Sequence, residues 1–493
     1  MKKIWALLLL LLFPALLVIR RSLSSQERPL VLQSATVIDA TGAPPRPDIT
    51  VVIAKGRITA LGRAGDVRVP EGAQVVDAGG KFLIPGLWDM HVHGATVGTF
   101  PTLFIANGVT GVRDMGFPLS QINPLRQKMK EGTLVGPRII AAGLIADGPK
   151  PVWPPAVSMA VGDEAGGRRA VAVLKKDGAD FVKVYSLLPR GTYFAVAEEA
   201  KQQGLPFAGH VPIAVSLAEV SDAGQGSVEH LDGLWLACSA REAEVRKEFV
   251  EAAGKSEPGA FLALQLRAET KSLDAYSEEK SRALFTRLAK NRTWQCPTLT
   301  VLRATAFLDD DHFTGDARFQ YLPSYFKPLW DPKQGARIKK ALDEASRRMV
   351  ELYEHLTPED LRHEKIKYRK YLAAVGAMRR AGVEFLAGTD TPSPYCFPGF
   401  SLHDELALLV EAGLTPMEAL QAATSNPARF AGLLDSLGTV EQGKVADLVL
   451  LDADPLRDIR HTRKIHAVVV GGKLLAKSEL EGMLARAADA NRR

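Results

Sequence analysis

The chain has 493 residues, 46% of them hydrophobic and 24% charged, which is ordinary for a soluble globular protein of about two to three domains. Its net charge of +6 is small, and its basic residues are interspersed with acidic ones, which argues against nucleic-acid binding. The three cysteines are far apart and predict neither a disulfide framework nor a C-x-x-C metal site: Cys238, Cys296 and Cys396.

The N-terminus resembles a secretory signal. Lys2 and Lys3 precede an apolar run over residues 4–19, which is shorter than the roughly 20 residues that a membrane-spanning helix needs. We therefore expect residues 1–25 to direct export, to the periplasm or out of the cell, and to be cleaved. The alternative is an uncleaved N-terminus that anchors the protein to the membrane through residues 4–19.

Both ends of the remaining chain are rich in Val, Ile and Thr, with Gly and Pro between the apolar runs, a pattern typical of short strands. Strands are predicted at 30–38, 49–54, 57–62 and 74–77, and again at 438–440, 446–452 and 465–474. We expect residues 27–80 and 438–478 to form one small β-sandwich domain from both ends of the chain, followed by a C-terminal tail at 479–493.

Residues 81–437 alternate short apolar strands with helical patterns, for example at 191–203 and 215–223. Such alternation is typical of parallel βαβ units, and eight of them fit an α/β fold, the (β/α)8 TIM barrel. The eight expected strands end at His93, Asp114, Leu144, Tyr185, His210, His230, Pro297 and Asp390.

A charged, helical insertion is predicted at about 240–380, and it contains an aromatic cluster from Phe319 to Trp330 that Pro323 and Pro328 interrupt. The cluster can be a hydrophobic patch that fixes the insertion to the barrel. It can also be a lid wall over the active site, because long loops are often functional.

Histidines collect where the predicted strands end. His91 and His93 alternate in the first strand, so their side chains share one face, and neutral imidazole is a common metal ligand. A bare His-x-His pair is weak evidence, since two histidines can alternate by chance. His210 and His230, however, end the fifth and sixth strands, at the face where such barrels carry their active sites. We therefore predict a metal site.

Lys183 lies among Val and Phe in the fourth predicted strand, where a charged amine is costly unless it is paired or neutral. A neutral lysine can take up carbon dioxide and become a carbamate, whose two oxygens could bridge two metals. A structural ion pair is the alternative reading of this residue.

Several motifs resemble the amidohydrolase superfamily of metal-dependent hydrolases. Pro85-Gly-Leu-Trp-Asp-Met-His-Val-His93 is similar to its strand-one motif, Gly388-Thr-Asp390 to its strand-eight motif, and 413–447 to its C-terminal signature. The resemblance implies that His91, His93 and Asp390 bind one divalent metal and that His210 and His230 bind the other, with zinc as the expected ion. It also implies that carbamylated Lys183 and a hydroxide bridge the two ions, and that Asp390 shuttles the proton.

Within the superfamily, this ligand set resembles the branch of imidazolonepropionase-like proteins and Xaa-Pro and Xaa-Arg dipeptidases. The dipeptidases tend to carry a tyrosine where this chain has Pro212, so a dipeptide substrate is less expected. Mononuclear deaminases usually carry a glutamate where this chain has Ile213, which argues against deamination.

The expected function is therefore hydrolysis of a carbon–nitrogen bond in a small amide, cyclic amide or peptide-like substrate. The alternatives are a lactonase or other ester or phosphoester hydrolase on the same site, and a catalytically silent scaffold. Tyr185 and His403 are candidate substrate-binding residues, while Asp89 and Asp114 are weaker candidates for supporting the site. The oligomeric state does not follow from the sequence.

Overall fold

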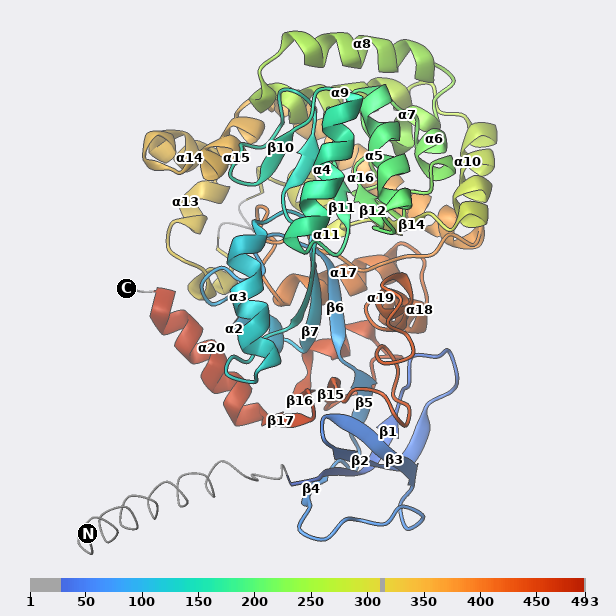
Figure 1. The fold of residues 1–493 in the computed structure, drawn as a ribbon, viewed down its shortest axis with the longest axis vertical. Helices are drawn as coiled ribbons and strands as arrows, with labels where there is room; N and C mark the ends of the chain where they lie inside the picture. Colours follow the sequence, from blue (N-terminus) through green and yellow to red (C-terminus); the bar gives the residue numbers. More distant parts are fainter. Residues whose placement is uncertain (1–27, 311–314, 492–493) are drawn as a thin grey trace, which may run out of the picture.

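The computed structural model of the chain describes residues 28–310 and 315–491 (Figure 1). The segment expected to direct export, residues 1–25, lies outside the described residues. Within the described part, no helix is both long enough and apolar enough to span a membrane.

Strands from both ends of the chain join one eight-stranded sheet, as predicted, and Figure 1 shows this sheet at one end of the molecule. Its strands are β1 (Leu30–Val37), β2 (Arg46–Ala54), β3 (Arg57–Arg63), β4 (Gln74–Asp77), β5 (Phe82–Pro85), β15 (Leu448–Leu451), β16 (Ile465–Val470) and β17 (Lys473–Ala476). The two ends meet where β5 pairs antiparallel with β15, with Leu83 opposite Leu450. Both side chains belong to one buried core because alternate residues of a strand point to the same face.

Two strand predictions in this domain need correction. The run 465–474 is a hairpin of two strands, because Gly471 and Gly472 have φ of 56° and 85° and turn the chain. Residues 438–440, expected to be a strand, form none. The expected tail is a helix, α20 (Lys477–Asn491), whose apolar face packs in one buried cluster with Ile105 and Val468.

The middle of the chain contains two parallel sheets. One consists of β6 (Leu87–Val92), β7 (Val109–Asp114) and β8 (Arg138–Ala141), in that order. The other has the order β10 (Ser158–Ala160), β9 (Ile145–Asp147), β11 (Val182–Val184), β12 (Phe207–Gly209), β13 (Ser227–Glu229) and β14 (Trp294–Cys296). The expected strand ending at Leu144 is interrupted, because Gly143 has φ of 77° and separates β8 from β9.

Residues 385–391 stand where the eighth parallel strand is expected. Phe385 bridges to Gln295 of β14, and Thr391 bridges to Val92 of β6, both in parallel. The segment forms isolated bridges instead of a continuous strand. Asp390 lies in the left-handed region with φ of 61°, which turns its side chain out of the regular ladder.

Helices follow most of the parallel strands, as the alternating pattern predicts. They are α2 (Phe100–Ala106), α3 (Leu119–Lys130), α4 (Glu164–Asp177), α5 (Arg190–Gln202), α6 (Leu217–Asp222), α17 (Phe400–Glu411), α18 (Pro416–Ala422) and α19 (Ser425–Phe430). In α4, the Asp163 side chain accepts a hydrogen bond from Gly166 N at the N-terminus, and Gly178 ends the helix with φ of 88°. The predicted helices at 191–203 and 215–223 are confirmed as α5 and α6.

The insertion is helical, as predicted, and α8, α9 and α10 lie at the end of the molecule away from the eight-stranded sheet (Figure 1). Its helices are α7 (Leu234–Ala237), α8 (Glu242–Lys255), α9 (Phe261–Leu273), α10 (Glu278–Asn291), α11 (Leu299–Ala306), α13 (Phe326–Trp330), α14 (Pro332–Ile338), α15 (Glu344–Glu354) and α16 (Pro358–Arg380). Buried Lys367 of α16 contacts Glu269 of α9 at 2.5 Å, which ties the two helices together.

Candidate active site

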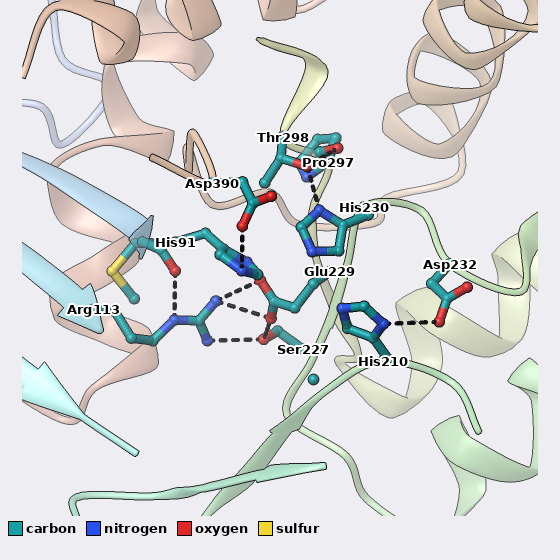
Figure 2. A network of polar contacts seen from close by, with 12 residues as sticks. His91, Arg113, His210, Ser227, Glu229, His230, Asp232, Pro297, Thr298 and Asp390 are labelled. Carbon is teal, nitrogen blue, oxygen red and sulfur yellow. Dashed lines mark hydrogen bonds and ion pairs between the residues drawn. The ribbon is translucent and has the colours of Figure 1, made fainter. Parts of the chain in front are cut away.

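Four of the residues predicted to bind metal lie close together in Figure 2: His91, His210, His230 and Asp390. Asp390 Oδ1 lies 3.2 Å from His91 Nε2 and 3.3 Å from His93 Nε2. The ring of His230 is 4.5 Å from that of His91 and 4.9 Å from that of His210, measured between centroids. The imidazoles therefore form one cluster, although the five residues come from segments 300 positions apart.

Each of the four histidines uses its Nδ1 atom for a contact within the protein. The contacts are His91 with Glu229 Oε2 at 2.8 Å, His93 with Gly116 O at 3.3 Å, His210 with Ser186 Oγ at 2.9 Å and His230 with Thr298 Oγ1 at 2.7 Å. A carboxylate and a carbonyl only accept hydrogen bonds, so Nδ1 of His91 and of His93 carries the proton. The lone pairs then reside on Nε2, the atoms that approach Asp390.

This arrangement fits a bound cation. The Nε2 atoms of neutral His91 and His93 and the carboxylate of Asp390 all offer lone pairs, so they repel one another unless a positive charge lies between them. Two ligands on one zinc ion at bond lengths of about 2.0–2.1 Å are roughly 3.3 Å apart in tetrahedral geometry, close to the observed separations. Ligand atoms of His91, His230 and Asp390 also lie within 4.8 Å of one another.

Lys183 of β11 is fully buried, and its Nζ has no hydrogen-bond partner among the described residues. Burial lowers the pKa of this amine to about 8, which makes the neutral form accessible near physiological pH. A neutral amine can react with carbon dioxide, and the resulting carbamate would place an anionic oxygen ligand beside the histidines. An ion pair, the alternative reading, is not found for Lys183 within the described part of the chain.

A buried network of charged side chains contacts the histidine cluster through His91. The sequence analysis did not identify this network. Arg113 of β7 donates from Nη2 to both carboxylate oxygens of Glu229 at 2.9 Å and from Nη1 to Ser227 Oγ at 2.9 Å. Burial alone would raise the pKa of Glu229, but the Arg113 charge and the hydrogen bond from His91 hold it well below its ordinary value. Arg113 and Glu229 are charged residues in predominantly apolar strands. The same pattern identified Lys183, so it could have identified these two residues as well.

The two weaker aspartate candidates hold backbone in place around the site. Asp89 accepts hydrogen bonds from Thr389 N at 3.0 Å and Thr389 Oγ1 at 2.7 Å, and so joins β6 to the segment that carries Asp390. Burial raises the pKa of Asp89 to about 7. Asp114 accepts from the backbone N–H groups of Ala95 and Gly116, which fixes the loop that follows His93.

A cavity of about 240 Å³ opens onto the cluster and is lined by His93, His210, His230, Asp390 and Tyr185. Tyr185 stacks on His210 with ring centroids 3.9 Å apart. Its hydroxyl accepts a hydrogen bond from Trp153 Nε1 at 2.9 Å, so its own hydrogen is free to donate to another group. Tyr185 therefore lies in the wall of this cavity, and its contact with a substrate stays a prediction.

His403 does not reach this cavity, which corrects the sequence-based expectation. It is buried in α17 and lines a separate hollow between α2, α17 and α20. Its Nδ1 lies 2.9 Å from Thr462 Oγ1, and its Nε2 lies 3.0 Å from Asn107 O. Both ring nitrogens are therefore occupied, and the residue fixes α17 instead of contacting a substrate.

Comparisons with known proteins agree with the motifs. Residues 333–475 match the model of the Amidohydrolase family. An ochratoxinase from Aspergillus niger is 38% identical over 109 residues, 21% of this chain and 22% of that protein. An imidazolonepropionase from Agrobacterium fabrum is 39% identical over 90 residues, 17% of this chain and 20% of that protein.

Among solved structures, a bottromycin amidohydrolase is similar with a TM-score of 0.71 at 22% identity, over 95% of this chain and 91% of that one. That similarity shows a shared fold. The alignments to the curated relatives span only about a fifth of their length. The resemblance to the amidohydrolase superfamily that the motifs predicted is confirmed.

Proposed function

We propose that this chain, which carries an amidohydrolase family domain at residues 333–475, is a binuclear metal-dependent hydrolase that cleaves a carbon–nitrogen bond in an amide, cyclic amide or peptide-like substrate. One observation carries the proposal. All four strand-end histidines direct Nδ1 to the protein and leave Nε2 for a metal. Two relatives of this chain are named ochratoxinase and imidazolonepropionase, and these names support a hydrolytic role.

The proposed metal ligands are those expected from the sequence. His91, His93 and Asp390 would hold one ion, His210 and His230 the other, and carbamylated Lys183 would contribute to both. When bound, divalent ions such as zinc supply Lewis-acid chemistry, because they lower the pKa of water and polarise a carbonyl group. The orphaned, buried amine of Lys183 supports the carbamate.

Asp390 is the proposed proton shuttle. Beside a bound divalent cation its carboxyl group would be ionised and able to accept a proton. Ser393 Oγ donates to Asp390 Oδ2 at 2.8 Å and fixes the carboxylate orientation. Asp390 would take a proton from the attacking water and pass it to the leaving nitrogen, while the Tyr185 hydroxyl would donate a hydrogen bond to the substrate.

We further propose that the parallel strands close into a (β/α)8 barrel at 81–437. Three contacts support closure: Asp180 N donates to Ala141 O at 2.9 Å between β8 and β11, and residues 385–391 bridge both β14 and β6. The eight-stranded sheet would form the small β-sandwich domain expected at 27–80 and 438–478, and its strand β5 extends the N-terminal part of that domain to residue 85. Its strand β3 approaches residue 445 from the other end of the chain, which supports a folded-over sheet.

A combined metal and substrate assay tests the function. Purified protein reconstituted with zinc should bind close to two ions per chain and hydrolyse at least one member of a screen of N-acyl amino acids, dipeptides, cyclic amides and lactones. Hydrolysis of lactones alone would favour the esterase alternative. Two bound ions without hydrolysis of any class would favour a silent scaffold, and one ion or none after full reconstitution would contradict the binuclear site.

Export remains a proposal that rests on the sequence of residues 1–25 alone. Cell fractionation of the full chain should place it outside the cytosol. Protein recovered from the membrane with residues 1–25 intact would identify the segment as an anchor, and full-length protein in the cytosol would contradict both forms of the proposal.

A further inference from the structure

The cavity beside the metal cluster has largely apolar walls. Around the rim, its lining includes Val97, Phe100, Phe117, Ile145 and Trp153. These side chains come from the segments that follow β6 and β7, from β9 itself and from the loop between β9 and β10. The parts of a ligand that contact these walls leave water, which favours apolar groups by about 25 cal/mol for each Å² buried.

The insertion supplies the opposite side of the cavity, which we call the insertion wall: Tyr325, Phe326, Leu329, Ala345 and Met349. The first three come from α13 and its N-terminus, and the last two from α15. Ala345 and Met349 are four residues apart, so they lie on the same face of α15. The insertion, which carries none of the proposed metal ligands, thus forms part of the cavity lining.

Charged groups on the cavity lining belong to the metal cluster alone. The lining residues that can carry charge are His93, His210, His230 and Asp390, and none of the described lining residues is a lysine or an arginine. Arg348 of α15 is directed elsewhere: it donates to Val152 O and lies 2.9 Å from Glu351 Oε2. The cavity therefore offers no protein cation for a substrate carboxylate.

From these walls we infer that the substrate is an uncharged amide with an aromatic or other compact apolar group and no free carboxylate, and that the insertion wall selects it. This inference rests on the proposed function. An ionised carboxylate that leaves water without a partner pays a large desolvation cost, whereas an aromatic group gains from burial. The volume also fits, since a cavity of ~150 Å³ lined by apolar side chains accommodates a benzene ring and this one is larger.

A matched pair of amides tests the charge preference. N-propylphenylacetamide and N-phenylacetyl-β-alanine share the acyl group and differ in a terminal methyl group that is replaced by a carboxylate. We expect the zinc-loaded full chain to bind the uncharged amide at least tenfold more tightly, measured as Kd by calorimetry, and to show the same preference in kcat/KM. Equal or tighter binding of the carboxylate, or no binding of either amide at millimolar concentration, would overturn the inference.

Variants of the insertion wall test where the preference arises. We call the Kd of the carboxylate amide divided by that of the uncharged amide the Kd ratio. Met349→Arg places a cation on the insertion wall and should lower this ratio at least tenfold, whereas Met349→Glu should raise it. Met349→Leu, which keeps the wall apolar, should leave the ratio within threefold of the original. Ser346→Arg, on the same face of α15, repeats the test if Met349→Arg does not fold. An unchanged Kd ratio in both arginine variants would show that the insertion wall does not select the substrate.

The two proposals fail in different ways. If the uncharged amide binds preferentially to protein with two metals and is not hydrolysed, the substrate preference stands and the proposed function fails. If the carboxylate amide binds and is hydrolysed preferentially, the proposed function stands and the inference fails. Metal content, measured on the same samples, separates both cases from a damaged site.

Discussion

Glu229 Oε2 lies 2.8 Å from Nδ1 of His91, and both residues are fully buried. The carboxylate accepts the imidazole hydrogen and thereby fixes the tautomer that leaves Nε2 free for a metal. Glu229 also neutralises Arg113, so one side chain orients a ligand and balances a buried charge.

The first prediction follows from this pair. Glu229→Gln should weaken zinc binding by about 10- to 100-fold, because an amide orients the imidazole less strongly than a carboxylate does. It should also lower the free energy of unfolding by about 3–5 kcal/mol, because Arg113 keeps a buried charge without its partner. Competition with a zinc chelator and urea unfolding measure the two effects.

Glu198→Gln is the matched control, since Glu198 forms an exposed ion pair with Arg168 and should change neither quantity. If Glu229→Gln loses stability but keeps the zinc affinity of the original protein, Glu229 only neutralises Arg113 and does not position His91.

The second prediction concerns Lys183. Lys183→Ala should lose both metal and activity, because the bridging ligand is missing, and short carboxylic acids such as acetate should restore part of both. Lys367→Ala is a sharp control, because Lys367 is equally buried but is paired with Glu269 and Glu364. It should lose stability and keep its metals. An active, metal-replete Lys183→Ala would end the carbamate proposal.

Carbamate formation also predicts a pH dependence. The pKa of Lys183 in the metal-free protein is about 8, so the amine is mostly protonated below pH 8 and mostly neutral above it. Only the neutral amine reacts with carbon dioxide. The rate at which bicarbonate activates metal-free protein for zinc uptake should therefore rise about tenfold per pH unit up to pH 8 and level off above it. Stopped-flow zinc uptake at fixed dissolved carbon dioxide checks this, and a flat profile would argue against the carbamate.

The clustering of the four histidines with Asp390 was predictable from the sequence because all of them lie at strand ends. Alternation in β6 puts His91 and His93 on one face, and the ends of parallel strands bring distant segments together. The buried ion pair beside His91 was harder to predict, since the pairing of Arg113 with Glu229 depends on two strands that are not neighbours in sequence. His403 was misassigned because a histidine shortly after a predicted strand looks the same whether its ring faces a cavity or a carbonyl group.

The fourth prediction uses the buried position of His403. Burial lowers its folded pKa to about 4, below the ordinary 6.5, so the unfolded chain takes up the proton first as the pH falls. The folded state should therefore lose about 3 kcal/mol of stability from this residue between pH 6.5 and pH 4, and none above pH 6.5. His403→Gln should lack that part of the pH slope in urea unfolding, whereas His355→Gln, at an exposed position, should keep it. Equal slopes in all three proteins would show that His403 titrates normally.

The last prediction separates two residues of the aromatic cluster in the insertion, for which the sequence left a packing patch and a lid wall open. Trp330 is 1% exposed and packs against Phe319, Phe326 and Phe397 at centroid distances of 5.3 to 5.5 Å, as a packing residue does. Tyr325 is 45% exposed and lines the cavity. The two halves of the cluster therefore have different surroundings.

Tyr325→Ala should lower kcat/KM by about tenfold, roughly 1.4 kcal/mol of transition-state stabilisation, with little change in Tm. Trp330→Ala should instead lower the free energy of unfolding by about 3–5 kcal/mol, because the large cavity left in a packed core is only partly filled by relaxation. Neither variant should change the metal content, since both residues lie outside the ligand set. If Tyr325→Ala keeps the original kinetics and only Tm falls, the insertion packs on the rest of the chain without touching substrate. The wall that contacts substrate would then have to be assigned to β9 and to the segments after β6, β7 and β9 alone.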